Sequence, residues 1–301
     1  MNVDSWQSTP VKSASLPRPA GTILGVGHAS VRLRRRARLA TAGARRLPGF
    51  LVIGAQRAGS TSLFAQLCAH PGVAAPSHKE IHYFDLQSFR SLRWYRSHFP
   101  PAAAARGRIT GEASPYYLFH PAVPARVAEA LPGVRLVAIV RDPVARAYSQ
   151  YQLSVRDGHE QLDFEEALRA EPDRLAGEED RLRADRAYRS PSHRHHSYAA
   201  RGAYAEQLRR WHQHVVPERL LVVSSEELFA DPRRTAAAVL EFLGLDPAEV
   251  PPLPVRNQRP YPPMSDAARS LLEARFEQPN RELYELLGRD LGWSRPPVAA
   301  T

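Results

Sequence analysis

The sequence has 301 residues, of which 43% are hydrophobic and 24% are charged, a composition typical of a soluble globular protein. It contains no run of 18 apolar residues, which excludes a transmembrane helix, and its single cysteine, Cys68, excludes an intramolecular disulfide. The formal net charge of +10 would suit a nucleic-acid-binding protein, so the place of that charge along the chain matters.

The excess of positive charge lies at the N-terminus. Residues 1–48 contain nine basic residues against Asp4 alone, whereas the remaining 253 residues are nearly neutral. The segment is rich in Ser, Pro, Gly and Arg without an apolar period, so we predict a disordered or loosely attached extension. Its short apolar stretch, 22–27, precedes the arginine run, which is the wrong order for a signal peptide. We therefore expect a cytoplasmic protein without a membrane span that does not bind nucleic acid.

From residue 50 onward, apolar strands alternate with helices. The run Phe50–Gly54 is typical of a buried parallel strand, and Ser60–Cys68 follows it as a helix. Further strands are predicted at 108–112, 135–140 and 219–224, and further helices at 142–155, 163–185, 201–215, 235–243 and, as a pair, 265–287. This alternation predicts an α/β, P-loop-like fold of three layers, with a central, mainly parallel sheet flanked by helices.

A glycine-containing loop joins the first strand to the first helix. Its sequence, GAQRAGST over residues 54–61, has both glycines of the nucleotide-binding pattern GxxxxGK[ST], but Ser60 replaces the lysine. Gly59 lets an anion approach the backbone, and the N–H groups from Ala58 to Thr61 point out of a helix N-terminus. Arg57 supplies a cation from within the loop. The loop therefore predicts a phosphate site, and the missing lysine disfavours the alternative of a P-loop-type nucleotide-dependent kinase.

The loop and three further segments resemble sulfotransferases that use 3′-phosphoadenosine 5′-phosphosulfate (PAPS), in the heparan-sulfate-type branch of N- and 3-O-sulfotransferases. In that family a lysine commonly occupies the place of Arg57. The resemblance is to a soluble, bacterial-looking member and covers about residues 49–293. The three segments, which occur in the family's order and spacing, are Lys79-Glu-Ile-His-Tyr-Phe-Asp85, Gly111-Glu-Ala-Ser-Pro-Tyr116 and Arg141-Asp-Pro-Val-Ala-Arg-Ala-Tyr-Ser149-Gln-Tyr151.

The resemblance implies transfer of a sulfuryl group from PAPS to a hydroxyl or amine, which leaves 3′-phosphoadenosine 5′-phosphate (PAP). Arg57 would stabilise the departing phosphate, and Glu80 would remove the acceptor's proton as general base. In an extended segment Glu80 and His82 would share one face, so His82 would orient Glu80 or contact the acceptor. Lys79 would neutralise sulfate oxygens. A solvated surface pair of Lys79 and Glu80 is the alternative interpretation.

The resemblance also implies that the nucleotide is held at both ends, with no metal ion required. Arg57 and the loop from Ala58 to Thr61 would bind the 5′-phosphosulfate. Arg141 and Ser149 would bind the 3′-phosphate, which distinguishes PAPS from ATP. Arg141 ends a strand, where open α/β sheets bind ligands, and Ser149 follows about two helical turns later. The alternative is that Arg141 pairs with a neighbouring carboxylate and Ser149 lies on the helix surface.

The acceptor is expected to be a small molecule or a glycan. The animal enzymes of this branch carry a membrane anchor that this sequence lacks, so a different acceptor from theirs is expected. Weaker candidates for acceptor contacts are Glu112, Ser114, Tyr116 and Tyr204.

We expect one domain over 49–295 and a short tail over 296–301. Within the domain, residues 172–200 are predicted to form a mobile loop over the acceptor cleft. The loop holds His193, His195 and His196. No carboxylate or Cys accompanies them at a metal-binding spacing, so a mobile loop is favoured over a metal site.

Overall fold

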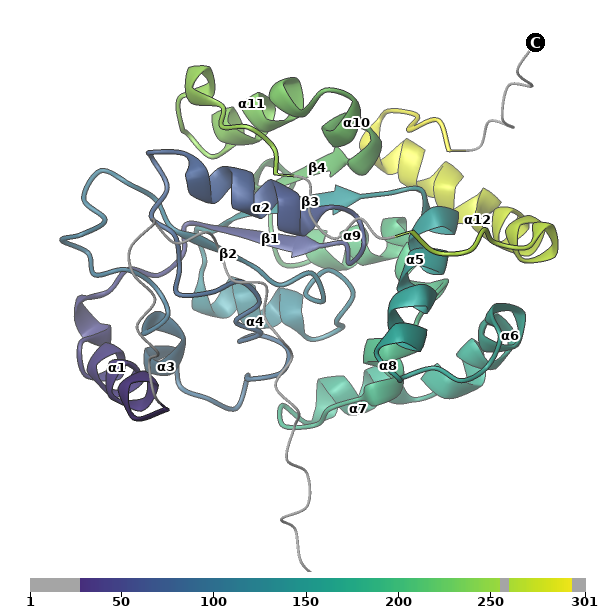
Figure 1. The fold of residues 1–301 in the computed structure, drawn as a ribbon, viewed down its shortest axis with the longest axis horizontal. Helices are drawn as coiled ribbons and strands as arrows, with labels where there is room; N and C mark the ends of the chain where they lie inside the picture. Colours follow the sequence, from purple (N-terminus) through teal and green to yellow (C-terminus); the bar gives the residue numbers. More distant parts are fainter. Residues whose placement is uncertain (1–27, 255–259, 294–301) are drawn as a thin grey trace, which may run out of the picture.

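The computed structural model describes residues 28–254 and 260–293. At its centre is a parallel four-stranded sheet with the order β2-β1-β3-β4 (Figure 1). The strands are β1 (Phe50–Gly54), β2 (Gly111–Ala113), β3 (Arg135–Val140) and β4 (Leu220–Ser224). The predicted α/β fold is confirmed, although β2 begins at Gly111 instead of Arg108.

Strand β1 is buried along its whole length because it pairs with strands on both edges and helices cover both faces of the sheet. Phe50 lies opposite Gly111 on β2 and opposite Arg135 on β3. A side chain on Gly111 would meet the Phe50 ring at 2.5 Å, so only glycine lets the ring lie across β2. The continuous apolar run that predicted this strand reflects burial on both faces of the sheet.

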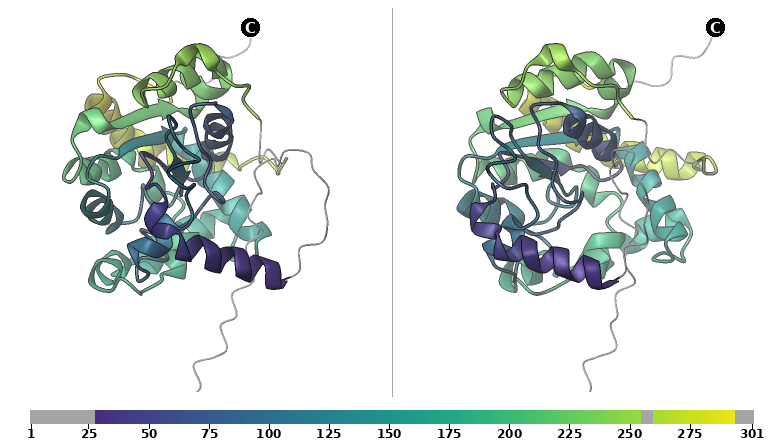
Figure 2. Two further views of the ribbon diagram at one scale, coloured as in Figure 1. Left: turned by 90° about the vertical axis from the view of Figure 1, so that its left-hand side faces the viewer. Right: turned by 60° about the vertical axis from the view of Figure 1, so that its left-hand side comes forward.

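Helices cover both faces of the sheet. Their bounds are α1 (His28–Ala40), α2 (Ser60–Ala69), α3 (Leu92–Arg96), α4 (Val123–Ala130), α5 (Pro143–Arg156), α6 (Phe164–Leu175), α7 (Glu178–Ala184), α8 (Pro191–His195), α9 (Tyr204–His212), α10 (Ser225–Ala230), α11 (Pro232–Phe242) and α12 (Asp266–Leu287). Helices α2, α10 and α11 lie on one side and α4 and α9 on the other (Figures 1 and 2). Beside the sheet, α5, α6 and α12 share a second apolar cluster around Tyr148, Phe164 and Phe276. Within the described ranges, no helix combines the length and apolarity needed to cross a membrane.

The extension predicted to be disordered over 1–48 is folded where the structure describes it. Residues 28–40 form α1, and Ala42–Ala44 form a short 3-10 helix in which Ala42 is fully buried. The Arg93 guanidinium on α3 donates to the carbonyls of Leu39 and Ala40, which end α1. The prediction was wrong here because it relied on the absence of apolar periodicity. Hydrogen bonds to residues far along the chain hold this segment, and periodicity does not reveal them. Residues 1–27 lie outside the described residues.

The segment 172–200, predicted to be a loop, contains two short helices. Helix α7 follows Gly177, whose φ is 71°, and has acidic residues in its first turn, where the helix dipole favours them. Helix α8 begins at Pro191 after Ser190, whose side chain caps it. Helix α7 falls within the helical stretch predicted over 163–185, which the structure divides into α6 and α7 before Gly177. Helix α8 was missed because it is short and is defined by its cap, without an apolar period.

The predicted C-terminal pair of helices is a single helix. Helix α12 runs from Asp266 to Leu287 through Pro279 and ends at Gly288, whose φ is 64°. Proline disfavours a helix interior, which suggested a break, but packing of Leu272, Phe276 and Leu283 into the core holds the helix together. The predicted tail, 296–301, lies outside the described residues.

Candidate active site

The predicted phosphate loop lies at the carboxyl end of β1, directly before α2. Gly59 is the residue that precedes α2, with a φ of 99°, and a side chain there would meet the Phe229 ring at 3.2 Å. Both constraints select glycine. The N–H groups of Ser60 and Thr61 start the helix and have no intrahelical acceptor, so they are suited to an anion.

The structure brings Arg57, Arg141 and Ser149 together. Arg57 Nε donates to Ser149 Oγ at 2.9 Å, and Arg141 Nη1 donates to the backbone carbonyl of Arg57 at 3.0 Å. Asp142 caps α5 by accepting from the N–H of Val144 at 3.0 Å, as predicted. The start of α5 and the loop after β1 therefore form one site.

Positive charge is concentrated at this site. Burial lowers the pKa of Arg57, and the nearby charge of Arg141 lowers it further. Among the described residues, neither guanidinium forms an ion pair with a carboxylate. A third guanidinium, that of Arg146 on α5, is fully buried, and its Nε and Nη1 have no hydrogen-bond partner within the described chain. An anion at this site would offset the mutual repulsion of these cations.

The Lys79–Asp85 segment forms a chain of charged contacts. Lys79 Nζ donates to Glu80 Oε1 at 2.5 Å, and His82 Nε2 lies 3.5 Å from Glu80 Oε2. On the other side of the ring, His82 Nδ1 lies 2.7 Å from Oδ2 of the buried Asp85. Lys79 is buried, whereas 43% of the Glu80 side chain is exposed. Among these contacting residues, Glu80 is therefore the most accessible from outside the protein.

The backbone of this segment differs from the extended one that was predicted. Glu80 and His82 both adopt left-handed φ angles, 62° and 55°. The N–H of Glu80 donates to the carbonyl of Ala113 at 3.0 Å, and the N–H of His82 donates to Ser114 Oγ at 3.2 Å. The two side chains still meet, but contacts with the end of β2 bring them together instead of the alternation of a strand.

These contacts set the charge states of Glu80 and His82. Burial alone would raise the pKa of Glu80, but Lys79 and His82 outweigh it and hold that pKa well below its usual range. Burial would lower the pKa of His82, but Asp85 and Glu80 raise it to about 9. Near neutral pH, Glu80 is therefore a carboxylate and His82 an imidazolium.

The weaker candidates for acceptor contacts are buried. Ser114 accepts from the backbone of His82, Tyr116 Oη lies 2.7 Å from His193 Nδ1, and Tyr204 Oη donates to the carbonyl of Arg141 at 2.9 Å. Glu112 is fully buried, and burial raises its pKa to about 8. All four side chains are therefore enclosed by the protein.

Arg201 was assigned no role in the sequence analysis, but it contacts the site. It is buried, donates to Gln56 in the phosphate loop, and lies over the Tyr116 ring with its guanidinium carbon 4.8 Å from the centroid. Its other nitrogens hold Ser197 Oγ at 2.7 Å and the carbonyls of His193 and Arg194. Arg201 thus ties the segment around α8 to the phosphate loop. The available signal was that residues 201–204 lie within the stretch that resembles the sulfotransferases.

The histidines of this segment are structural where they are buried. His193 is 1% exposed and stacks on Phe119 with a centroid distance of 4.2 Å, in helix α8. Within residues 28–254 and 260–293, no three His, Cys, Asp or Glu side chains are placed to hold a metal ion.

Comparison with known proteins gives the family. Residues 47–266 match the sulfotransferase domain family. Heparan sulfate glucosamine 3-O-sulfotransferase 6 of Mus musculus is 28% identical over 307 residues, which cover 93% of this chain and 84% of that protein. The membrane-associated sulfotransferase kil1 of Dictyostelium discoideum is 26% identical over 315 residues, covering 82% of this chain and 66% of kil1.

A solved structure is similar as well. The crystal structure of a sulfotransferase from Alicyclobacillus acidocaldarius has 30% sequence identity and a TM-score of 0.66, and the match covers 83% of this chain and 100% of that one. These comparisons favour the predicted sulfotransferase over the kinase alternative. Since the family match spans most of the sequence, we conclude that the chain belongs to the sulfotransferase domain family.

Proposed function

We propose that this sulfotransferase transfers a sulfuryl group from PAPS to a hydroxyl or amine of a glycan or small-molecule acceptor. The observation that carries the proposal is the contact of Arg57, in the phosphate loop, with Arg141 after β3 and with Ser149 on α5. One nucleotide with phosphates at its 5′ and 3′ positions would satisfy both parts of the site. The proposal needs no metal ion, because arginines supply the positive charge.

The charge and the backbone donors of the site support PAPS as the donor. The N–H groups of Ser60 and Thr61 at the start of α2 are available to a phosphate, whereas the N–H of Ala58 donates to the carbonyl of Ala55 at 3.3 Å. Bound PAPS supplies an activated sulfuryl group and a phosphate leaving group. Arg57 would stabilise negative charge on that phosphate, while Ser149 holds Arg57 Nε and thereby fixes the direction of its two terminal nitrogens. Arg141 and the hydroxyl of Ser149 would bind the 3′-phosphate.

Arginine in the place of the family's lysine changes one aspect of this chemistry. Lysine is a point donor that shifts between oxygens, whereas arginine is a wide, permanently charged fork. Because Ser149 already occupies Nε, Arg57 presents a fixed pair of donors to the phosphate. We therefore propose that Arg57 binds the leaving phosphate firmly and that Lys79 supplies the mobile cation near the sulfuryl oxygens.

Glu80 would act as the general base. Its two carboxylate oxygens are engaged by Lys79 and His82, so an acceptor hydroxyl or amine would compete with Lys79 for Oε1. Moving Lys79 away from Glu80 raises the pKa of the carboxylate and makes it a stronger base. His82, fixed by Asp85, would keep Glu80 oriented throughout.

A glycan is the acceptor class that the relatives support best, since the mouse relative acts on glucosamine in heparan sulfate by its name. The Glu80 side chain is 43% exposed, which leaves access for such a chain. We retain the prediction of a cytoplasmic enzyme as part of the proposal.

A thermal-shift comparison of PAP, ADP and ATP with Mg²⁺ tests the proposed donor. We expect PAP to raise the midpoint of unfolding most, because only PAP has a 3′-phosphate for Arg141 and Ser149. The shift should persist in EDTA. Greater stabilisation by ATP with Mg²⁺ than by PAP would contradict the proposal and favour a kinase.

A further inference from the structure

The net positive charge of the protein is concentrated in two segments. Residues 33–49 carry six arginines and residues 86–110 carry five, with no Asp or Glu in either segment. The rest of the chain from residue 50 onward carries 27 basic and 30 acidic residues. We call the surface formed by 33–49 and 86–110 the arginine face.

The two segments of the arginine face are joined by hydrogen bonds. Arg93 on α3 donates to the carbonyls of Leu39 and Ala40 at 3.3 and 3.2 Å. Arg45 Nη1 donates to the carbonyl of Phe99 at 2.7 Å. Figures 1 and 2 show α1 beside α3 at one corner of the molecule. Their charges therefore act from one surface.

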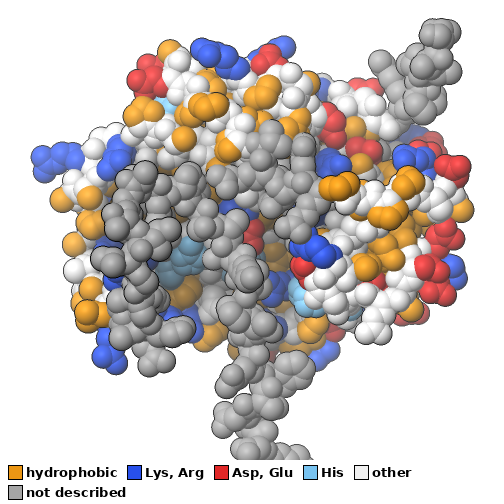
Figure 3. Space-filling model, in the orientation of Figure 1, with side chains coloured by type: hydrophobic (Ala, Val, Ile, Leu, Met, Phe, Trp, Pro, Cys, Tyr) orange, Lys and Arg blue, Asp and Glu red, His pale blue; other side chains and the backbone are white. Residues whose placement is uncertain are grey.

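The charge of the arginine face is not neutralised within the described chain. Arg34, Arg35 and Arg36 are exposed, and none of the eleven arginines forms an ion pair with a carboxylate of a described residue. In the space-filling view, blue and red side chains mix on the side of the molecule where α6 and α12 lie (Figure 3). Hydrogen bonds to carbonyls position these guanidinium groups but leave their charge in place.

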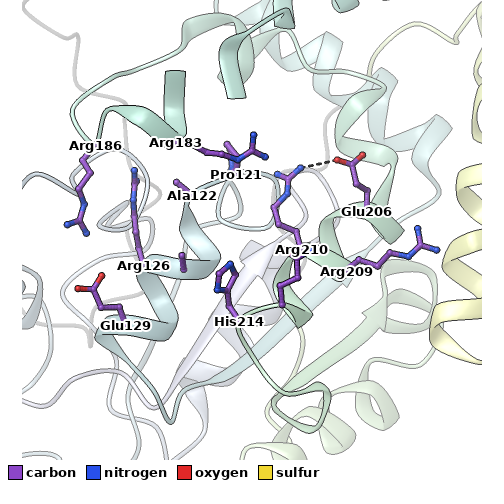
Figure 4. Close-up of a pocket in the computed structure, with 12 residues that line it drawn as sticks. Pro121, Ala122, Arg126, Glu129, Arg183, Arg186, Glu206, Arg209, Arg210 and His214 are labelled. Carbon is purple, nitrogen blue, oxygen red and sulfur yellow. Dashed lines mark hydrogen bonds and ion pairs between the residues drawn. The ribbon is translucent and has the colours of Figure 1, made fainter. Parts of the chain in front are cut away.

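A second group of arginines shows the contrast. They line a groove of about 760 Å³ between α4, α7 and α9 (Figure 4). The ion pairs in and around this groove are Arg183–Glu179, Arg210–Glu179, Arg210–Glu206 and Arg209–Glu282. Because carboxylates offset most of its charge, the groove attracts an anion less than the arginine face does.

The arginine face continues to the proposed catalytic residues. The N–H of Ser77 donates to the carbonyl of His98 at 2.8 Å, and the His78 and His98 rings lie 4.9 Å apart, edge to face. Burial, together with His78 and the arginines at 38, 35 and 90, lowers the pKa of His98 to about 3. His78 directly precedes Lys79 and Glu80, so the positive potential of the face extends to the position where an acceptor would react.

We propose that the arginine face is an exosite that binds the anionic groups of a carboxylated or sulfated glycan, while a hydroxyl or amine of that glycan lies at Glu80. The inference rests on the proposed function and names its acceptor class. A glycan of this kind carries anions and free hydroxyls on one chain. A DNA duplex and an anionic bilayer offer the charge but no internal sugar hydroxyl that reaches Glu80.

Charge reversal on α1 tests the exosite. The variant Arg35→Glu/Arg36→Glu changes two exposed residues outside the catalytic and nucleotide-binding groups. With heparin oligosaccharides as the probe, we expect affinity to fall about tenfold at low salt and the salt dependence of binding to become shallower. The matched control is Arg233→Glu/Arg234→Glu, which makes the same charge change at exposed residues of α11 and should leave affinity within about twofold.

Three outcomes would overturn the exosite. Equal losses in both variants would show that only net charge matters. Tighter binding of a DNA duplex or of phosphatidylglycerol vesicles than of heparin would assign the face to another class of partner. Unchanged heparin affinity in Arg35→Glu/Arg36→Glu would remove α1 from the site. A PAP thermal shift measured on the same variants separates these results from the proposed function, because PAP stabilisation should be equal in all of them.

Discussion

Glu80→Gln is expected to lower turnover by about 10²- to 10⁴-fold while leaving PAP affinity within about threefold of the wild type. Glutamine keeps the size of the side chain and an oxygen for Lys79, but it cannot accept the proton of an acceptor hydroxyl. Glu80 contacts Lys79 and His82 and does not contact Arg57, Arg141 or Ser149. Turnover with a glycan acceptor and PAP binding by calorimetry measure the two effects separately.

Two controls make this result specific. Glu282→Gln makes the same substitution at a carboxylate that also forms an ion pair, with Arg209, and should keep normal turnover. The free energy of unfolding of Glu80→Gln should also be measured, because the buried Lys79 loses a charged partner. Normal turnover combined with a tenfold loss of PAP affinity would show that Glu80 binds the nucleotide and is not the base.

Arg141→Ala should weaken PAP binding by about 1.5–3 kcal/mol, which is about a 10- to 150-fold change in Kd. Arg141 is one of the two residues assigned to the 3′-phosphate, and charge-assisted hydrogen bonds to phosphate are of this size. Adenosine 5′-phosphosulfate lacks the 3′-phosphate, so its affinity should change much less. Some loss is expected for it too, because Arg141 holds the carbonyl of Arg57 in the loop.

The matched control for Arg141→Ala is Arg135→Ala. Arg135 begins the same strand and also donates to a backbone carbonyl, that of Leu243 at 2.9 Å, but lies at the opposite end of β3. Its removal changes the charge equally and should leave the affinity for both nucleotides intact. Equal losses of PAP and of adenosine 5′-phosphosulfate in Arg141→Ala would refute the assignment to the 3′-phosphate.

The sequence predicted the parts of the fold that local patterns determine. Strands β1, β3 and β4 are continuous apolar runs, and Asp142 followed by Pro143 marks the start of α5. Strand β2 was placed too early because only three residues pair with β1. The helix predicted over 163–185 is divided into α6 and α7, and α8 was missed because it is short and depends on its cap and on tertiary packing.

The site was predictable as a set of residues but not as a set of contacts. Resemblance of four segments identified Arg57, Glu80, Arg141 and Ser149, and the structure brings Arg57 beside Arg141, which follows β3, and Ser149 on α5. The hydrogen bond between Arg201 and Gln56 joins residues 145 positions apart, and no local pattern reports such a contact. The unpartnered nitrogens of Arg146 are similarly invisible in sequence, because burial of a helix face depends on what packs against it.

A crystal structure of the protein with PAP tests the central proposal most directly. We expect one nucleotide to span the site, with its 5′-phosphate at the N–H groups of Gly59, Ser60 and Thr61 and its 3′-phosphate at Arg141 and Ser149. A PAP molecule with either phosphate outside hydrogen-bond reach of its assigned residues would contradict the account.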